Sequence, residues 1–199
     1  VGTDVSVGKM FTSLAIEREM KARGMKADFR ATGQTGIFIA GDGASVDAVV
    51  ADFIAGAAEW LTPANDPDHW DVVEGQGSLF HASYSGVTLG LIHGARPHAL
   101  VLCHDAARLE MRGTPGVPVP ALEDCIAVNE RMAQMFEPDA KVIGVSVNTS
   151  SMDAARATQY LAEVSERLNL PAVDAVRTGV APIVDAIEIP SMKPVSLAA

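Results

Sequence analysis

The sequence lacks long apolar runs, clustered cysteines and an excess of positive charge. No stretch of about 18 apolar residues occurs, so no membrane-spanning helix is predicted. The two cysteines, Cys103 and Cys125, have no metal-ligand spacing, and we expect reduced, buried thiols of a cytoplasmic protein. Only 15 Lys and Arg face 25 Asp and Glu, which gives a net charge of −10. Neither a nucleic acid nor an anionic membrane is therefore expected as a partner.

Strand-like and helix-like segments alternate along the 199 residues, 48% of which are hydrophobic. The strand patterns cover residues 26–32, 70–73, 98–104, 141–147 and 172–176. The helix patterns cover residues 9–23, 83–94, 121–136, 152–168 and 180–187. Such alternation is typical of βαβ units. It predicts one α/β domain over residues 1–199, a three-layer fold with helices on both faces of a mostly parallel sheet.

The segment between the first two predicted strands is expected to contain a turn, a short apolar run and a helix. Residues 33–36 have turn composition, and residues 37–40 form a short apolar run. Ser45 is placed to cap a helix that follows it. One face of that helix has the i, i+3, i+4, i+7 spacing of buried residues, namely Val46, Val49, Val50, Phe53, Ile54 and Ala57. In the helix predicted at 83–94, Gly86 and Gly90 cost about 1 kcal/mol each relative to Ala.

The first ten residues have the composition of a phosphate-binding loop. A Gly-rich turn from Gly2 to Gly8 leads through Lys9 into a predicted helix. Backbone N–H groups, the helix N-terminus and the lysine together favour a bound anion. The G-x-x-x-x-G-K-[ST] pattern is altered, because five residues separate the glycines and Met10 replaces the hydroxyl that holds Mg²⁺. The loop is thus expected to bind a pyrophosphate, with no protein metal site.

The predicted cofactor-binding residues lie in this loop and at the end of one later strand. They are Gly2, Thr3, Asp4, Val7, Gly8, Lys9, Met10 and Asn148. The chain begins at Val1, directly before the loop. Since such a loop normally follows a buried strand, we expect that strand, and a preceding domain, to lie outside the given sequence.

Three titratable residues near predicted strand ends are candidates for proton transfer. Glu74 follows the strand at 70–73, where it could orient a metal-bound water, act as a general base or hydrogen-bond a Gly-rich turn. Asp42 lies between two glycines, a position that suits either substrate contact or turn formation. His81 is either a proton-transfer group near neutral pH or a structural histidine.

Four polar residues are candidates for substrate or adenine contacts. Arg108 and Arg112 lie in a Pro-rich segment and would share a face at helical spacing, where paired guanidinium groups bind carboxylate or phosphate. The alternative for both is a solvated surface position. Asn148 ends a Val-rich strand and would either read an adenine edge or cap a turn. Gln34 lies in the Gly-rich turn after the strand at 26–32 and is a candidate substrate-binding residue.

Several of these stretches resemble known families. Residues 2–9, with the Val-Glu-Gly-Gln-Gly stretch at 73–77, resemble the loop and Glu-Gly motif of dethiobiotin synthetase and other P-loop proteins. The whole set is more similar to the DgcN-type D-glutamate N-acetyltransferase family, formerly a family of unknown function. The stretches that carry this resemblance are 2–10, 31–36, 40–43, 73–79 and 112–113. The resemblance implies a P-loop NTPase-like fold and a preceding Rossmann-like N-terminal domain.

The resemblance also implies an activity, the transfer of acetyl from acetyl-CoA to the amine of D-glutamate or a similar amino acid. The loop would hold CoA phosphates, Arg108 or Arg112 would bind substrate carboxylates or the CoA 3′-phosphate, and Glu74, Asp42 or His81 would accept a proton. No phosphoryl group is transferred, so the Mg²⁺-binding hydroxyl that Met10 replaces is dispensable. Dethiobiotin synthetase-like proteins keep a threonine there.

Two other functions stay open at this point. One is an ATP- and Mg²⁺-dependent ligase or kinase resembling dethiobiotin synthetase. The other is a nucleotide-binding regulatory protein without turnover. Under the acetyltransferase hypothesis the expected partners are small-molecule substrates, the protein's own N-terminal domain and further copies of itself in a homo-oligomer.

Overall fold

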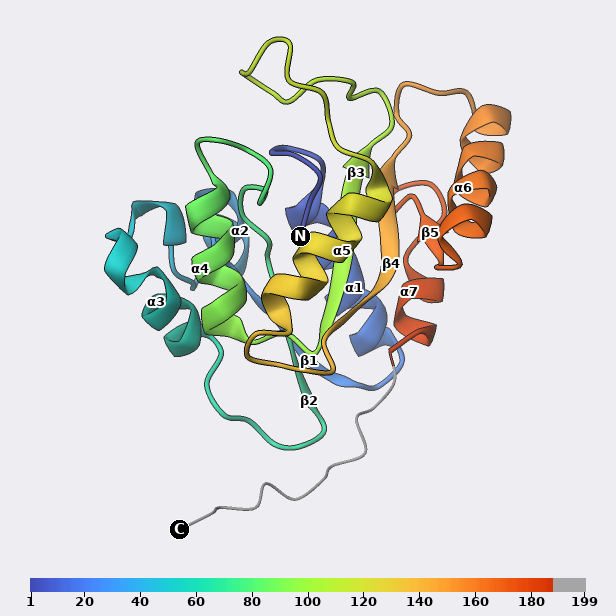
Figure 1. Ribbon diagram of the computed structural model, residues 1–199. Helices are drawn as coiled ribbons and strands as arrows, with labels where there is room; N and C mark the ends of the chain where they lie inside the picture. Colours follow the sequence, from blue (N-terminus) through green and yellow to red (C-terminus); the bar gives the residue numbers. More distant parts are fainter. Residues whose placement is uncertain (188–199) are drawn as a thin grey trace.

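A computed structural model describes residues 1–187 of the chain (Figure 1). The strands are β1 (Lys26–Arg30), β2 (His69–Val73), β3 (Ala99–Asp105), β4 (Lys141–Asn148) and β5 (Ala172–Val173). The helices are α1 (Lys9–Ala22), α2 (Gln34–Ala40), α3 (Ile54–Leu61), α4 (Ser85–Ala95), α5 (Leu122–Ala133), α6 (Ala154–Leu168) and α7 (Ala181–Asp185). Two short 3₁₀ turns, η1 (Val46–Ala48) and η2 (Ala51–Phe53), precede α3.

Every strand pair within the described residues is parallel. β1 pairs with β2, and β4 lies between β3 and β5. The first residues of the chain lie beside β3, since the amide of Thr3 donates to the Cys103 carbonyl at 3.0 Å and the amide of Cys103 donates to the Val1 carbonyl at 2.9 Å. The turn after β2 also lies beside this segment, since a Cβ on Gly75 would lie 3.3 Å from the Val1 nitrogen.

Helices cover both faces of this arrangement, as the alternating pattern predicts. α4 and α5 lie in front of the strands in the view of Figure 1, and α1 lies behind them. The core on the α5 face includes Leu102, Val145 and Cys125, each fully buried. The core on the other face joins α1 to α7 through Met20 and Ile183. The predicted three-layer α/β fold is thus confirmed.

Residues 34–57 differ from the sequence prediction. The turn and apolar run become α2, and the single helix after Ser45 becomes η1, η2 and then α3. The chain is extended at Val49 and Val50, with ψ of 138° and 136°, as β-branched residues favour. Val50 and Phe53 are consequently 69% and 67% exposed instead of buried. The Ser45 hydroxyl bonds the Asp47 carboxylate and caps no helix.

Two further details complete the comparison with the sequence patterns. β5 is shorter than predicted, because the Asp174 carboxylate accepts the amides of Val176 and Arg177 and turns the chain.

Residues 106–120, called here the Pro-rich loop, contain no helix and project beyond the end of β3 (Figure 1). Among residues 1–187, none of the helices has both the length and the apolar character needed to cross a bilayer.

Glycines in α4 allow this helix to approach α3 closely. A Cβ on Gly94 would overlap the Ala55 carbonyl oxygen and lie 2.7 Å from the Ala58 Cβ. A Cβ on Gly90 would lie 2.5 Å from the Ile54 side chain, whereas one on Gly86 would meet nothing within 4 Å. Low helix propensity at positions 90 and 94 is therefore offset by close packing of the two helices.

Gly94→Ala is expected to lower the free energy of unfolding by about 1–3 kcal/mol, because the added methyl group forces α3 and α4 apart. Gly86→Ala is the matched control and should leave stability unchanged or raise it by up to about 1 kcal/mol. Urea unfolding followed by circular dichroism measures both. Equal effects of the two substitutions would contradict the packing argument.

Candidate functional site

The phosphate loop folds tightly around its own lysine. Ser6 and Gly8 have positive φ angles of 54° and 99°, and α1 begins immediately afterwards at Lys9. The Lys9 side chain is only 8% exposed, and its Nζ donates to the Asp4 carbonyl at 2.8 Å. Burial lowers the pKa of Lys9, while the nearby Asp4 and Glu74 carboxylates oppose that shift. A Cβ on Gly2 would lie 3.0 Å from this Nζ and from the Asp4 carbonyl oxygen, so a larger residue there would crowd the lysine and the loop.

The fully buried Asp4 carboxylate connects the phosphate loop to the Pro-rich loop. Its Oδ2 accepts the Arg108 guanidinium at 2.6 Å and the Arg112 amide at 2.7 Å, and its Oδ1 accepts the Val5 amide at 2.7 Å. Burial raises the pKa of Asp4, yet the hydrogen bonds from Arg112, Val5 and Arg108 outweigh it and hold the pKa below its usual value. Asp4 therefore holds the loop in place from within.

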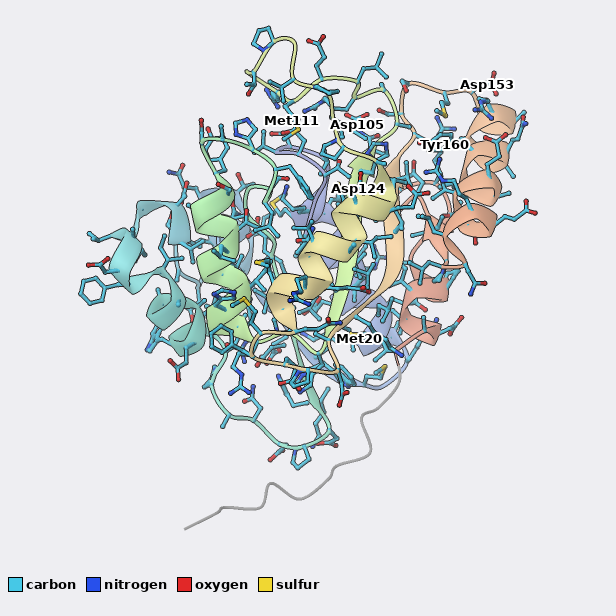
Figure 2. All side chains as sticks on the ribbon, in the orientation of Figure 1. Met20, Asp105, Met111, Asp124, Asp153 and Tyr160 are labelled. Atoms are coloured by element: carbon cyan, nitrogen blue, oxygen red, sulfur yellow. The ribbon has the colours of Figure 1, made fainter. Side chains whose placement is uncertain are left out.

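The two predicted substrate arginines have different environments. The Arg108 guanidinium contacts Asp4 and lies 3.6 Å from the Asp105 carboxylate, so it is paired inside the protein. Arg112 is exposed and is tied down by its backbone, whose carbonyl accepts the His81 Nε2 at 2.8 Å. Figure 2 labels Asp105, at the end of β3, and Met111, in the Pro-rich loop at the same edge of the molecule.

His81 is buried, and both of its ring nitrogens contact the backbone. Nδ1 accepts the Ser83 amide at 3.1 Å, which leaves Nε2 as the protonated nitrogen that donates to Arg112. The ring also lies 4.7 Å from that of Tyr84, centroid to centroid. The contacts of His81 thus correspond to the structural alternative left open by the sequence.

Glu74 is buried at the end of β2, beside the first turn of α2. Its Oε2 accepts the amides of Thr32 and Gly33 at 3.0 and 3.2 Å. A Cβ on Gly36 would overlap this carboxylate. Burial raises the pKa of Glu74, although the two amides and Lys9 act in the opposite direction. Glu74 therefore joins the ends of β1 and β2, and its charge lies within electrostatic reach of the lysine.

The remaining predicted residues lie toward solvent or cap turns. Asp42 is exposed, and its carboxylate accepts the Gly43 amide at 2.8 Å. Gln34 is exposed at the first position of α2. Asn148 lies opposite Asp105 across β3 and β4, and its side-chain oxygen accepts the Ser150 amide at 3.0 Å. Met10 is half-buried in the first turn of α1.

A cavity of about 200 Å³ opens over the phosphate loop. It lies between that loop, η1, the turn after β2 and the start of α4, and its lining residues are Val5, Ser6, Lys9, Asp47, Gln76, Gly77, Tyr84 and Val87. Lys9 is the predicted site residue that lines it. Asp47 and Tyr84 carry no motif, so only the fold brings them to the loop. Gln76 lies in the Gly-rich stretch that the family resemblance singles out.

No group of three or more His, Cys, Asp or Glu side chains within residues 1–187 is arranged to hold a metal ion. The loop's N–H groups and buried Lys9 are suited to an anion such as a phosphate.

Asp4→Asn is expected to destabilise the protein by about 1.5–3 kcal/mol at pH 7, the range for hydrogen bonds to a charged group. Because the pKa of Asp4 is lowered in the folded state, its stabilising effect is present above the unfolded value, near 4, and is lost as the pH falls through the folded pKa. Urea unfolding between pH 7 and pH 3 should therefore show the wild-type advantage shrinking on acidification.

The control for this series is Asp139→Asn. Asp139 is exposed just before β4, at the other end of the strands from the site, and its replacement should change stability by less than about 0.5 kcal/mol. A difference between wild type and Asp4→Asn that stays constant down to pH 3 would show that the charge of Asp4 is not what matters.

Curated proteins of similar sequence align with most of this chain. Two curated proteins named D-glutamate N-acetyltransferase match it, one from Tritonibacter scottomollicae at 57% identity and one from a Pseudoalteromonas species at 49%. They cover 94% and 92% of the chain, which spans about half of each relative, 56% and 55%. The predicted resemblance to this family is confirmed.

A solved structure shows the same fold. The crystal structure of a DUF1611 family protein from Anabaena variabilis matches with a TM-score of 0.89 and 39% identity, and the match covers 94% of this chain and 55% of that one. The family model described as "Domain of unknown function (DUF1611_C) P-loop domain" matches residues 1–184. The chain therefore belongs to the DUF1611 family and forms its P-loop domain.

Proposed function

We propose that this domain binds acetyl-CoA in a protein that acetylates the amine of D-glutamate or a closely similar amino acid. The observation that carries the proposal is the phosphate loop with its buried Lys9, which lines a cavity of about 200 Å³. Because this volume is below the ~300–1,000 Å³ usual for drug-sized ligands, only part of the cofactor would lie in the cavity and the rest would extend along the surface of the domain. The names of two relatives at 57% and 49% identity support the same reaction.

In this proposal the loop binds the CoA pyrophosphate. The amides after Ser6 and the start of α1 donate to phosphate oxygens, and Lys9 supplies the neutralising charge. Met10 offers no hydroxyl at the position where P-loop proteins hold Mg²⁺. This loss is tolerable for acetyl transfer, because no metal has to bridge phosphates during the reaction.

The chemistry requires a neutral amine. The ammonium loses a proton, its nitrogen attacks the thioester carbonyl, the C–N bond forms, and the C–S bond breaks with its electron pair leaving on sulfur. The nitrogen then loses a second proton to give the amide, and the sulfur takes up a proton to give the free thiol. Of the three candidate proton acceptors, Glu74 is buried, has a raised pKa and lies near Lys9, although it accepts two backbone amides and does not itself line the cavity. Asp42 is exposed, and His81 has both ring nitrogens engaged.

The whole protein is proposed to contain more than this domain. The chain spans 56% and 55% of the two curated relatives. A preceding Rossmann-like domain, a homo-oligomeric assembly and a cytoplasmic location complete the proposal. The adenine contact of Asn148 and the substrate contacts of Arg112 and Gln34 belong to the same proposal. Arg108 is proposed to act indirectly, by fixing the Pro-rich loop through Asp4.

The reaction is tested by thiol release from acetyl-CoA with the full-length protein and a panel of D- and L-amino acids. Thiol release with D-glutamate, independent of ATP and Mg²⁺, is the expected result. ADP formation that requires Mg²⁺, without any thiol release, would replace this proposal by the ATP-dependent ligase or kinase. Binding of nucleotide without turnover of either kind would favour the regulatory alternative.

Lys9→Ala should weaken acetyl-CoA binding by about 1.5–3 kcal/mol, because a charge-assisted contact to phosphate is lost. Isothermal titration of the full-length protein measures this change. Lys26→Ala is the control, since Lys26 is at the start of β1, pairs with Asp66 and Asp68 on the surface and lies away from the loop. If both variants bind acetyl-CoA as the wild type does, the loop is not the phosphate site.

A further inference from the structure

The cavity over the phosphate loop has charged groups of both signs. Lys9 supplies the cation, and Asp47 is the only carboxylate among the lining residues. The remaining polar side chains are the Gln76 amide, the Tyr84 hydroxyl and the exposed Ser6 hydroxyl, and Val5 and Val87 are apolar. A cavity with one cation, one anion and neutral donors matches a zwitterion better than a polyphosphate.

Asp47 is held by rigid structure. Its neighbour Val46 is fully buried and packs with Ala58 and Leu91 of α3 and α4. The Val46 amide donates to the Thr32 carbonyl at 3.1 Å, which ties η1 to the end of β1. The anchored backbone at Val46 thus places the exposed Asp47 side chain at the cavity.

The Asp47 carboxylate is oriented and still has binding capacity. Its Oδ1 accepts the Ser45 hydroxyl at 2.7 Å. Its other oxygen has no protein hydrogen-bond donor among the described residues. Asp47 is exposed and lines the cavity, and no lysine or arginine of residues 1–187 forms an ion pair with it.

The other carboxylates near the phosphate loop are already engaged. Asp4 accepts Arg108 and two backbone amides, and Glu74 accepts two backbone amides at the start of α2. Neither of them lines the cavity. Asp47 is therefore the carboxylate that this cavity offers to a cation.

We propose that this cavity is the acceptor subsite and that Asp47 binds the ammonium group of the amino acid. That the ligand is an amino acid rests on the function proposed above. That the cavity offers a carboxylate to a cationic group follows from its lining residues. The Gln76 amide and the Tyr84 hydroxyl bind the substrate carboxylates, with Lys9 at the boundary between acceptor and CoA phosphates. Asp47 is a specificity-determining residue in this proposal, and it selects ligands that carry an amine.

The test compares two ligands that differ in the amine alone. D-glutamate and glutarate have the same two carboxylates, but glutarate has no ammonium group. Equilibrium titrations of the full-length protein with each ligand are carried out on wild type, Asp47→Asn and the control Asp52→Asn. Asp52 is an exposed residue of η2 that does not line the cavity.

The expected result is selective. Asp47→Asn weakens D-glutamate binding at least tenfold and changes glutarate binding less than twofold, while Asp52→Asn leaves both affinities at the wild-type level. An unchanged affinity for D-glutamate in Asp47→Asn would overturn the assignment. An equal loss for both ligands would also overturn it, because the residue would then shape the cavity without contacting the amine.

Two further measurements separate this inference from the proposed function. Acetyl-CoA affinity of Asp47→Asn within twofold of wild type shows that the variant is folded and its loop intact. Acetyl transfer is then assayed on the same samples. If the wild type releases no thiol but the ligand comparison holds, the acetyltransferase proposal fails and the ammonium subsite stands. If the wild type acetylates D-glutamate and Asp47→Asn keeps the same KM, the subsite assignment fails and the function stands.

Discussion

The buried carboxylate of Asp4 is the interaction on which the geometry of the site depends. Hydrogen bonds from Val5, Arg108 and Arg112 converge on it, so the phosphate loop and the Pro-rich loop share one anchor. A charge this deep is tolerated only because it has several donors, and removing one of them exposes the full cost of burying the charge. The loop that Asp4 anchors leads directly into α1, whose N-terminus favours a bound anion.

Glu74 is a second buried carboxylate that holds backbone near the phosphate loop through hydrogen bonds. It holds the Thr32–Gly33 turn by two amides and needs Gly36 for space. His81 adds a third fixed contact, to the Arg112 carbonyl. Two of the three candidate proton acceptors, Glu74 and His81, thus also hold the backbone of the site, and the residues that line the cavity include Lys9, Gln76, Tyr84 and Asp47.

Most of the fold could be predicted because its periodic patterns are local. The α1 and α6 helices and the β2 and β4 strands have strong helix or strand patterns, and each agrees with its predicted range within a few residues. Residues 34–57 could not be predicted in the same way. There Glu74, 42 positions from Thr32, fixes the start of α2, and the extended Val49–Val50 pair divides a sequence with helical spacing. Tertiary contacts overrode local propensity.

The sequence by itself determined that residues 2–10 have the pattern of a phosphate loop with a lysine and without the Mg²⁺-binding hydroxyl, because glycines, lysine and methionine at fixed spacing define that chemistry locally. The tertiary structure alone decided what the other polar residues do. Asp4 and Arg108 meet across 104 positions, and Asp47 reaches the loop only because η1 is tied to β1. No local pattern encodes such pairings. They arise from the order of the parallel strands and from the packing of α3 against α4, which determines the side chains that line the cavity.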